Sequence, residues 1–251
     1  MRGTEDITLI GDVKPIGMVP ALLLFFVPGV AFYLNIGVLV PFLNRTLALT
    51  PFVVWLVTGT LLLFAPLFAL VFVLLKLDGY RLDWATVKAR LNLRRIEWSD
   101  VGWVVGGLAV SAVASGLIVL CWKVLDPMLS LQELKSVSPI EVSALTGHDR
   151  LWIVGLPVFY FFNYFGEELL WRGYILPRQV LSLGVWAWPV NAVFHGIFHL
   201  AFGLRALAPF APFLLLMPYL VYKRRNTYLA VIVHAILGAP MQFAIAVGLL
   251  S

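Results

Sequence analysis

Residues 160–177 read YFFNYFGEELLWRGYILP, and the two adjacent glutamates follow an apolar run of more than fifteen residues. A helix needs about 20 predominantly apolar residues to cross the bilayer core, so this run is close to the length of a membrane span. Carboxylates cost several kcal/mol in hydrocarbon, and where they occur inside a membrane segment they are usually functional. The stretch therefore indicates a membrane helix that carries acidic side chains.

Helix geometry separates the roles of the two glutamates. Glu168 and Arg172 are four residues apart, on one helix face and in the favourable order for an ion pair. Adjacent residues point about 100° apart on a helix, so Glu167 has no cation in register and shares its face with Asn163. We expect Glu168 to pair with Arg172, which leaves Glu167 free to react.

Two interpretations of this stretch follow. If the helix continues past Arg172, Glu167 lies near mid-span, where a desolvated carboxyl is suited to act as a general base near neutral pH. If the span ends at the glutamates, Glu168 and Arg172 are interfacial charges, and Gly166 and Gly173 mark a loop.

The composition of the whole chain supports a membrane protein. Of 251 residues, 61% are hydrophobic and 12% are charged, and the mean hydropathy is +0.95. Soluble domains are nearer one quarter charged. The apolar content excludes a disordered chain, and the single cysteine, Cys121, excludes a disulfide scaffold. The net charge of +5 comes from basic residues spread between apolar runs, which is typical of membrane topology and not of nucleic-acid binding.

The apolar runs predict one all-α, polytopic integral membrane domain over residues 1–251. Seven spans are expected, with eight as the alternative count, because Pro51 and Pro66 are expected to bend the second run and three prolines to make the sixth irregular. We expect no secretory signal peptide, since the first run is too long. The predicted spans are about 17–42, 47–75, 101–125, 150–170, 184–202, 206–222 and 227–250.

The distribution of Lys and Arg predicts the orientation. With seven spans and the N-terminus inside, 13 of the 18 basic residues fall on the inner side. We therefore expect a cytoplasmic N-terminus, in the plasma membrane if the source is prokaryotic. Residues 126–149 are expected to form an outer loop. Residues 76–100 are expected to form a cytoplasmic amphipathic connecting segment, or else an ordinary loop. Its apolar positions fit one face of a short helix, and they are Leu82, Trp84, Val87 and Leu91.

Three of the four histidines lie within apolar spans. His148 belongs to the predicted outer loop, where we expect it to be solvated. His195 and His199 are four residues apart in one span, and His234 lies in the last. Polar groups in membrane helices face the bundle interior, so these three and Glu167 are expected to converge on one cavity.

Two chemistries fit such a cavity. The spacing of His195 and His199 suits a metal, and Glu167 or His234 could complete a zinc site. However, no Glu stands between the histidines as in HExxH, and no cysteine is available. Alternatively, Glu167 and a histidine position a water without a metal, and His234 stabilises the oxyanion. We favour the second chemistry, with no cofactor, and keep zinc as the alternative.

Three ordered motifs carry a resemblance to a known family. EExxxR stands at Glu167–Arg172, the FxxxH position reads HGIFH at 195–199, and the HxxxN or HxxxD position reads HAILG at 234–238. On these motifs the chain resembles the CAAX protease and bacteriocin-processing family of intramembrane glutamic endopeptidases. The resemblance covers about residues 150–245, which we take as the catalytic core.

The resemblance implies an endopeptidase that cleaves a peptide bond in or near the bilayer. It implies that Glu167 is the general base on water, that His199 helps to hold that water, and that His234 donates to the oxyanion. Glu168 and Arg172 would support the site. The implied partners are membrane lipids and a peptide or prenylated protein substrate.

Two positions depart from the family motifs. His195 stands where Phe is usual, which adds a titratable group near the site. Gly238 stands where Asn or Asp, thought to assist the oxyanion site, is usual. The loss of one such donor costs about 10²–10³ in rate, so reduced activity is expected unless Gln242 or a backbone N–H substitutes.

Two other classes of function compete. Gly238 is the main support for a non-catalytic member of the same family, in a bacteriocin-immunity or scaffold role. A proton-coupled transporter also uses intramembrane Glu and His, but the sequence has no visible inverted repeat.

Overall fold

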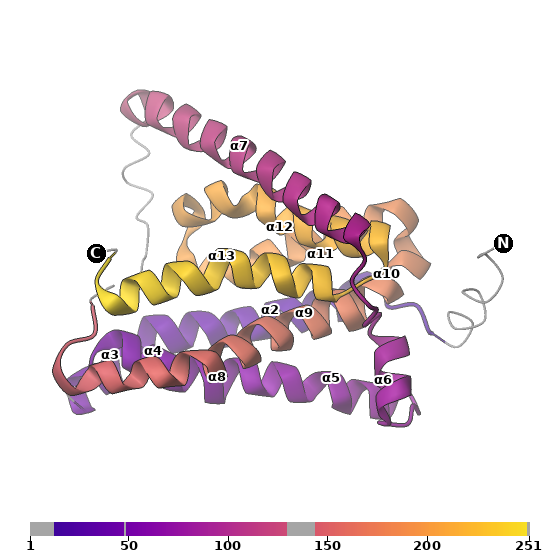
Figure 1. The fold of residues 1–251 in the computed structure, drawn as a ribbon, viewed down its shortest axis with the longest axis horizontal. Coiled ribbons are helices and arrows are strands. Elements are labelled where there is room, and N and C mark those ends of the chain that lie inside the picture. The colour runs from indigo at the N-terminus through magenta and orange to yellow at the C-terminus, as the bar shows by residue number, and fades with distance from the viewer. Residues whose placement is uncertain (1–12, 48, 130–143, 250–251) are drawn as a thin grey trace.

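The described part of the chain is helical throughout, as predicted. The computed structural model describes residues 13–47, 49–129 and 144–249, and no strand occurs among them (Figure 1). The elements before the undescribed segment 130–143 are α2 (Met18–Leu34), η1 (Asn35–Leu39), α3 (Val40–Leu47), α4 (Pro51–Thr58), η2 (Gly59–Phe64), α5 (Ala65–Leu77), α6 (Trp84–Arg90) and α7 (Trp98–Leu129). The elements after it are η4 (Gly147–Gly155), α8 (Leu156–Tyr160), η5 (Phe161–Phe165), α9 (Gly166–Glu168), η6 (Leu169–Ile175), α10 (Leu176–Leu183), η7 (Gly184–Trp186), α11 (Ala187–Phe198), η8 (His199–Phe202), α12 (Leu204–Arg224) and α13 (Tyr228–Val247).

By length and apolar composition, the described residues contain six candidate membrane spans. They are Met18–Leu47, Pro51–Leu77, Trp98–Leu125, Gly147–Phe202, Leu204–Arg224 and Tyr228–Val247. The predicted count of seven or eight is therefore approximate. The fourth candidate is 56 residues long and contains both the predicted fourth and fifth spans, because the helical turns continue through the reversal between them.

The chain reverses direction at Gly184, whose φ is +56°. α11 then packs antiparallel to the helix that precedes it. The Asn191 amide donates to the Trp171 carbonyl at 3.1 Å and to Gln179 Oε1 at 2.9 Å. One turn further along α11, His195 contacts Glu167, which lies earlier in the chain than Trp171. The 56-residue run is thus two antiparallel segments.

Prolines disturb the helices less than expected. α12 is one continuous helix, although it contains three prolines, so the prediction of an irregular sixth span is wrong. Hydroxyls from α7 bond its backbone: Ser115 donates to the Pro209 carbonyl at 2.7 Å, and Ser111 to the Pro212 carbonyl at 3.3 Å. Such bonds from a neighbouring helix accommodate prolines within membrane spans.

The second span also differs from the prediction. Pro51 is the first residue of α4, a position where its missing N–H would have no helical partner, so it starts the helix and does not bend it. Pro66 follows the π-helical segment η2 at the start of α5, within a continuous helical run.

The two segments between spans depart partly from expectation. Asp83 caps the short helix α6 by accepting from the Thr86 N–H at 2.9 Å. Of the four apolar residues of this segment, Val87 and Leu91 are buried, whereas Leu82 and Trp84 are exposed. α7 extends to Leu129, so residues 126–129 are helical and not loop, and 130–143 lie outside the described residues.

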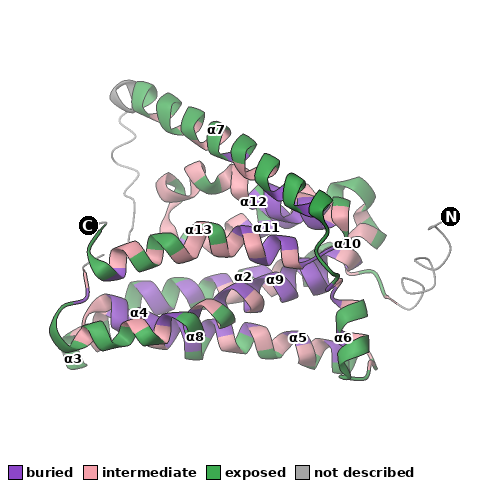
Figure 2. Ribbon diagram, in the orientation of Figure 1, coloured by how far each residue is buried: buried purple, intermediate pink, exposed green. Residues whose placement is uncertain are grey.

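The aromatic core lies between the two halves of the chain. Fully buried rings come from both halves, and α7 contributes little, since most of its surface is exposed (Figure 2). Phe25 stacks on Trp171, and Phe32 packs on Phe198, with ring centroids 5.0 Å apart in each pair. This packing holds α2 against the helices that carry the glutamates and the histidines.

Candidate active site

The glutamates lie midway along a helix that does not end at Arg172. Helical turns continue from Leu156 to Leu183, which places Glu167 about 17 Å from the first and about 24 Å from the second at 1.5 Å per residue. The side chains of Glu167, Glu168 and Arg172 are 0–1% exposed. The interpretation of these residues as interfacial charges at the end of a span is therefore wrong.

Packing requires the two glycines that flank the pair. A Cβ on Gly166 would lie 2.6 Å from the Phe64 carbonyl oxygen, so this glycine allows α9 to approach the second span closely. A Cβ on Gly173 would lie 3.3 Å from the Leu91 carbonyl oxygen. Both glycines are buried inside the helix and neither marks a loop.

The backbone around the glutamates is π-helical. The short α9 that holds them lies between the π-helical segments η5 and η6. π-helical turns are rare and are frequent at functional sites, because the extra residue per turn redirects side chains. Here they aim the two carboxyl groups at different helices.

Glu168 and Arg172 form the predicted ion pair. Arg172 Nη1 lies 3.2 Å from each carboxylate oxygen and donates to Oε1. The other terminal nitrogen, Nη2, lies 2.7 Å from His195 Nδ1. Because a guanidinium only donates, His195 Nδ1 is the acceptor of this bond.

His195 links Arg172 to Glu167. With Nδ1 accepting, the neutral imidazole carries its proton on Nε2, which lies 3.1 Å from Glu167 Oε2 and donates to it. The His195 side chain is fully buried. The residue at the position where the family motif has Phe is therefore a direct partner of Glu167, which the sequence did not indicate.

The other two histidines contact one glutamate each. His199 Nε2 is 3.7 Å from Glu167 Oε2, beyond hydrogen-bond distance. His234 Nδ1 lies 2.9 Å from Glu168 Oε1. Helix α13 thus contacts Glu168 directly, while η8 holds His199 next to Glu167.

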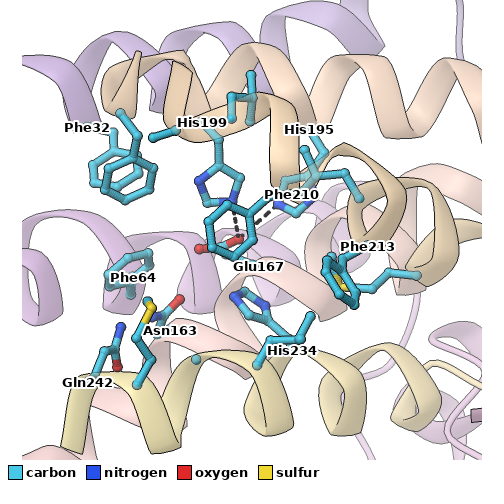
Figure 3. A pocket seen from close by; sticks show the side chains of 18 of the residues that line it. Phe32, Phe64, Asn163, Glu167, His195, His199, Phe210, Phe213, His234 and Gln242 are labelled. Atoms are coloured by element: carbon cyan, nitrogen blue, oxygen red, sulfur yellow. Dashed lines mark hydrogen bonds and ion pairs between the residues drawn. The ribbon is translucent and has the colours of Figure 1, made fainter. Parts of the chain in front are cut away.

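One cavity of about 420 Å³ is lined by Glu167 and by the three histidines that were expected to converge with it. Figure 3 shows Glu167 among His195, His199 and His234, with Asn163 and Gln242 together to one side. The remaining walls are apolar, from both halves of the chain. They comprise Phe32, Phe52, Trp55, Phe64, Phe202, Ala206, Leu207, Phe210, Phe213, Leu214, Met217, Leu237, Gly238, Met241 and Ile245.

The hydrogen bonds of His195 affect whether this residue can act as a metal ligand. Donor atoms of Glu167, His195 and His199 lie within 4.8 Å of one another, as do those of Glu167, Glu168 and His234. A metal-bound histidine donates its other ring N–H to an acceptor. His195 instead accepts from a guanidinium on that nitrogen, so its Nε2 lone pair is not free for a metal.

The second ligand set does not resemble a zinc site either. Its Glu168 is already paired with Arg172, and its single imidazole, His234, uses Nδ1 on that same carboxylate. In this arrangement each set thus has at least one ligand residue already engaged by Arg172.

Tyr164 occupies the space beside Gly238. A Cβ on Gly238 would lie 2.7 Å from Tyr164 Oη, so a side chain at 238 would collide with this ring. Gln242, predicted as a substitute donor, lies about 12 Å beyond His234 along α13. It lines the same cavity as Asn163, one helical turn after Gly238 on α13 (Figure 3).

The comparison with protein families covers this region. Residues 149–239 match the family described as type II CAAX prenyl endopeptidase Rce1-like. This part of the chain, less than half of its length, is similar to an Rce1-like domain. All three motifs lie within the matched residues, and Gln242 lies outside them. No curated protein and no solved structure matches the chain. At the level of the family, the Rce1-like domain is that of a membrane endopeptidase of the CAAX protease type.

A second ion pair, which is partly buried, was missed by sequence reasoning. Arg178 Nη2 lies 2.5 Å from Asp78 Oδ2, which also accepts from the Tyr174 hydroxyl at 2.9 Å. This cluster joins α10 to the end of α5 below the active site. The only signal in the sequence was an arginine one turn after Tyr174, in a segment expected to be helical.

Proposed function

We propose that the protein is a multi-pass intramembrane endopeptidase of the glutamate type, which activates water with Glu167 and requires no metal. The observation that carries this proposal is the cavity, where a buried carboxylate in the middle of a helix lies among three histidines from two other helices. An ionisable group at this depth is a functional site by default.

Glu167 acts as the general base. His195, whose ring is held by Arg172, donates to Oε2, which fixes the plane of the carboxylate and leaves Oε1 to accept a proton from water. Such positioning contributes about 10²–10⁴ to general-base catalysis. His199 Nε2, 3.7 Å from the same carboxylate, helps to hold the attacking water.

His234 stabilises the oxyanion. Its Nδ1 lies 2.9 Å from Glu168 Oε1, which orients the ring, and with protons on both ring nitrogens its Nε2–H donates to the tetrahedral intermediate. A donor of this kind is worth about 10²–10³ in rate. Glu168 and Arg172 support the site by holding His234 and His195.

The substrate is a hydrophobic peptide or a prenylated protein. The cavity walls apart from the site residues are aromatic and aliphatic, which suits an apolar chain entering from the lipid. The inferred location is the plasma membrane if the source is prokaryotic, with a cytoplasmic N-terminus.

Turnover by purified protein in lipid nanodiscs tests the proposal. A fluorogenic peptide, with and without a prenyl group, should be cleaved by the wild type, and Glu167→Gln and His199→Ala should each lose at least about 10² in rate. Glu97→Gln is the matched control, since this glutamate is exposed. Equal rates for the wild type and the Glu167→Gln variant would contradict the proposal.

Chelation tests the metal-free mechanism separately. Treatment with 1,10-phenanthroline or EDTA should leave turnover unchanged, and elemental analysis of the same samples should find no stoichiometric zinc. Bound zinc whose removal abolishes turnover would overturn this part of the proposal.

Tyr164 favours a second candidate, the non-catalytic role. Its ring fills the space where a donor side chain at Gly238 would lie, which would suit an immunity factor or scaffold that no longer cleaves. Rescue of a deletion phenotype by the Glu167→Gln variant would support this second function.

A further inference from the structure

We propose that Asn163 and Gln242 form a subsite that hydrogen-bonds the backbone of the bound peptide beside the scissile bond. The inference deepens the proposed endopeptidase function and rests on it. It assigns a binding role to two carboxamides that the catalytic residues do not use.

Both carboxamides have an unsatisfied oxygen. Asn163 Oδ1 and Gln242 Oε1 are buried, and neither has a hydrogen-bond partner among the described residues. A buried polar atom without a partner is costly, by about 1–3 kcal/mol, so such atoms are rare in folded proteins. The Asn163 residue is 5% exposed, and both side chains line the cavity (Figure 3). The two carboxamides at the cavity wall therefore have hydrogen-bonding capacity that no described residue uses.

The two residues lie at a fixed offset from the catalytic groups. Asn163 is on the same helical run as Glu167, four residues earlier, or about 6 Å along the axis. Gln242 follows His234 on α13 by about 12 Å. An extended peptide advances about 3.3 Å per residue. A substrate with its scissile bond at Glu167 therefore brings a peptide group about two to four residues away to the carboxamides.

The chemistry of the pair matches a peptide group. A primary carboxamide presents one carbonyl acceptor and an NH₂ donor, and so complements both the N–H and the C=O of a backbone. The residues that line the cavity include no Lys or Arg, so the subsite lacks the cation that a carboxylate or phosphate would require.

The cavity walls next to the two carboxamides are apolar. Beside the pair the cavity is lined by Phe64, Met241 and Ile245, none of which can hydrogen-bond a backbone amide. A peptide that left its amide unpaired there would lose the free energy of desolvating it. The carboxamides supply the partners that this part of the wall lacks.

Equilibrium binding tests the subsite without turnover. The full chain carrying Glu167→Gln, in nanodiscs, is titrated with a fluorescent hydrophobic peptide and with analogues in which one backbone amide after another is replaced by an ester. At one position, about two to four residues from the scissile bond, the ester should raise Kd about fivefold, the effect of one hydrogen bond.

Variants then locate the partner of that amide. In the same background, Asn163→Leu and Gln242→Leu should each raise the Kd of the all-amide peptide about fivefold and bring the ester penalty below about twofold. Met241→Leu is the matched control, because it changes a neighbouring wall that has no hydrogen-bonding group, and it should keep the full ester penalty.

The outcomes separate the subsite from the catalytic proposal. An ester penalty that is absent at every position, or that persists unchanged in both leucine variants, overturns the subsite, since the carboxamides then serve only the fold or bind water. A wild-type protein that shows the predicted ester penalty but cleaves nothing contradicts the endopeptidase proposal and leaves the peptide-binding subsite standing.

Discussion

Arg172 supplies the positive charge that balances the buried carboxylates of the site. Its guanidinium pairs with Glu168 at 3.2 Å and donates to His195 at 2.7 Å, and all three side chains are fully buried. The buried cluster contains two carboxylates and one arginine. If the arginine is lost, no other cation in the cluster balances the charge of the carboxylates. The removal of one partner from a buried ion pair costs about 3–5 kcal/mol, because the other charge is left unpaired.

Arg172→Met should therefore destabilise the protein by about 3–5 kcal/mol. Equilibrium unfolding in mixed micelles measures this loss. The matched control is Arg45→Met, which removes an exposed arginine and should change the free energy of unfolding by less than about 0.5 kcal/mol. Adding Glu168→Gln to Arg172→Met should recover part of the loss. If the two arginine variants are equally stable, the pair does not hold the site together.

The two histidines of α11 and η8 should respond differently to the same substitution. His195→Phe removes a partner from both Arg172 and Glu167, and should cost about 1–3 kcal/mol of stability with a moderate fall in kcat, since it acts on water only through Glu167. His199→Phe should cost less stability but at least about 10² in kcat, because it faces the water. Unfolding and turnover measured on both variants distinguish them, and a larger kcat loss for His195→Phe would reverse the proposed roles.

Sequence predicted contacts within one helix better than contacts between helices. Glu168 and Arg172 are one turn apart, so any helix brings them together. Glu167 and His195 are separated by 28 residues, and the register of two helices decides which of two histidines reaches the carboxylate. That register depends on side-chain packing, which one sequence does not encode in a readable pattern.

At the scale of elements, the long apolar runs predicted the positions of most spans. They did not predict the backbone conformation within those spans. The lengths of α12 and α13 follow from uninterrupted apolar sequence. The π-helical segments η5 and η6 do not, because α- and π-helical turns differ by one hydrogen-bond register and the choice depends on tertiary packing. At Gly166 an added Cβ would lie 2.6 Å from the backbone of the second span, at the Phe64 carbonyl oxygen.

Gly166→Ala should destabilise the protein and impair catalysis. The added Cβ would lie 2.6 Å from the Phe64 carbonyl oxygen, and backbone must move to relieve it. Overpacking of this kind costs about 1–3 kcal/mol, and the displacement of the adjacent Glu167 should lower kcat. Unfolding and turnover are measured together.

Gly106→Ala is the control for this prediction. It lies in α7, where an added Cβ meets nothing within 4 Å, so alanine should raise helix stability by about 0.5–1 kcal/mol. If both alanine variants are equally stable, the close approach at Gly166 is not required.

For the whole molecule, the convergence of Glu167 with the histidines on one cavity was predictable, and the origin of the cavity walls was not. The rule that polar groups in membrane helices face inward was enough to bring the four together. Phe32, Trp55 and Phe64 come from the first half of the chain, where the sequence shows only apolar spans. Nothing in such spans distinguishes a residue that lines a cavity from one that faces lipid.

The orientation in the membrane is the last prediction. α6 lies at one end of the molecule, and the start of α8, preceded by η4, lies at the other (Figure 1). Lys88 on α6 and His148 in η4 are both exposed, and the excess of Lys and Arg places Lys88 in the cytoplasm. In a Cys121→Ser background, a membrane-impermeant maleimide should label His148→Cys in intact cells and Lys88→Cys only after permeabilisation. The reverse pattern would invert the topology, and labelling of both in intact cells would contradict a fixed orientation.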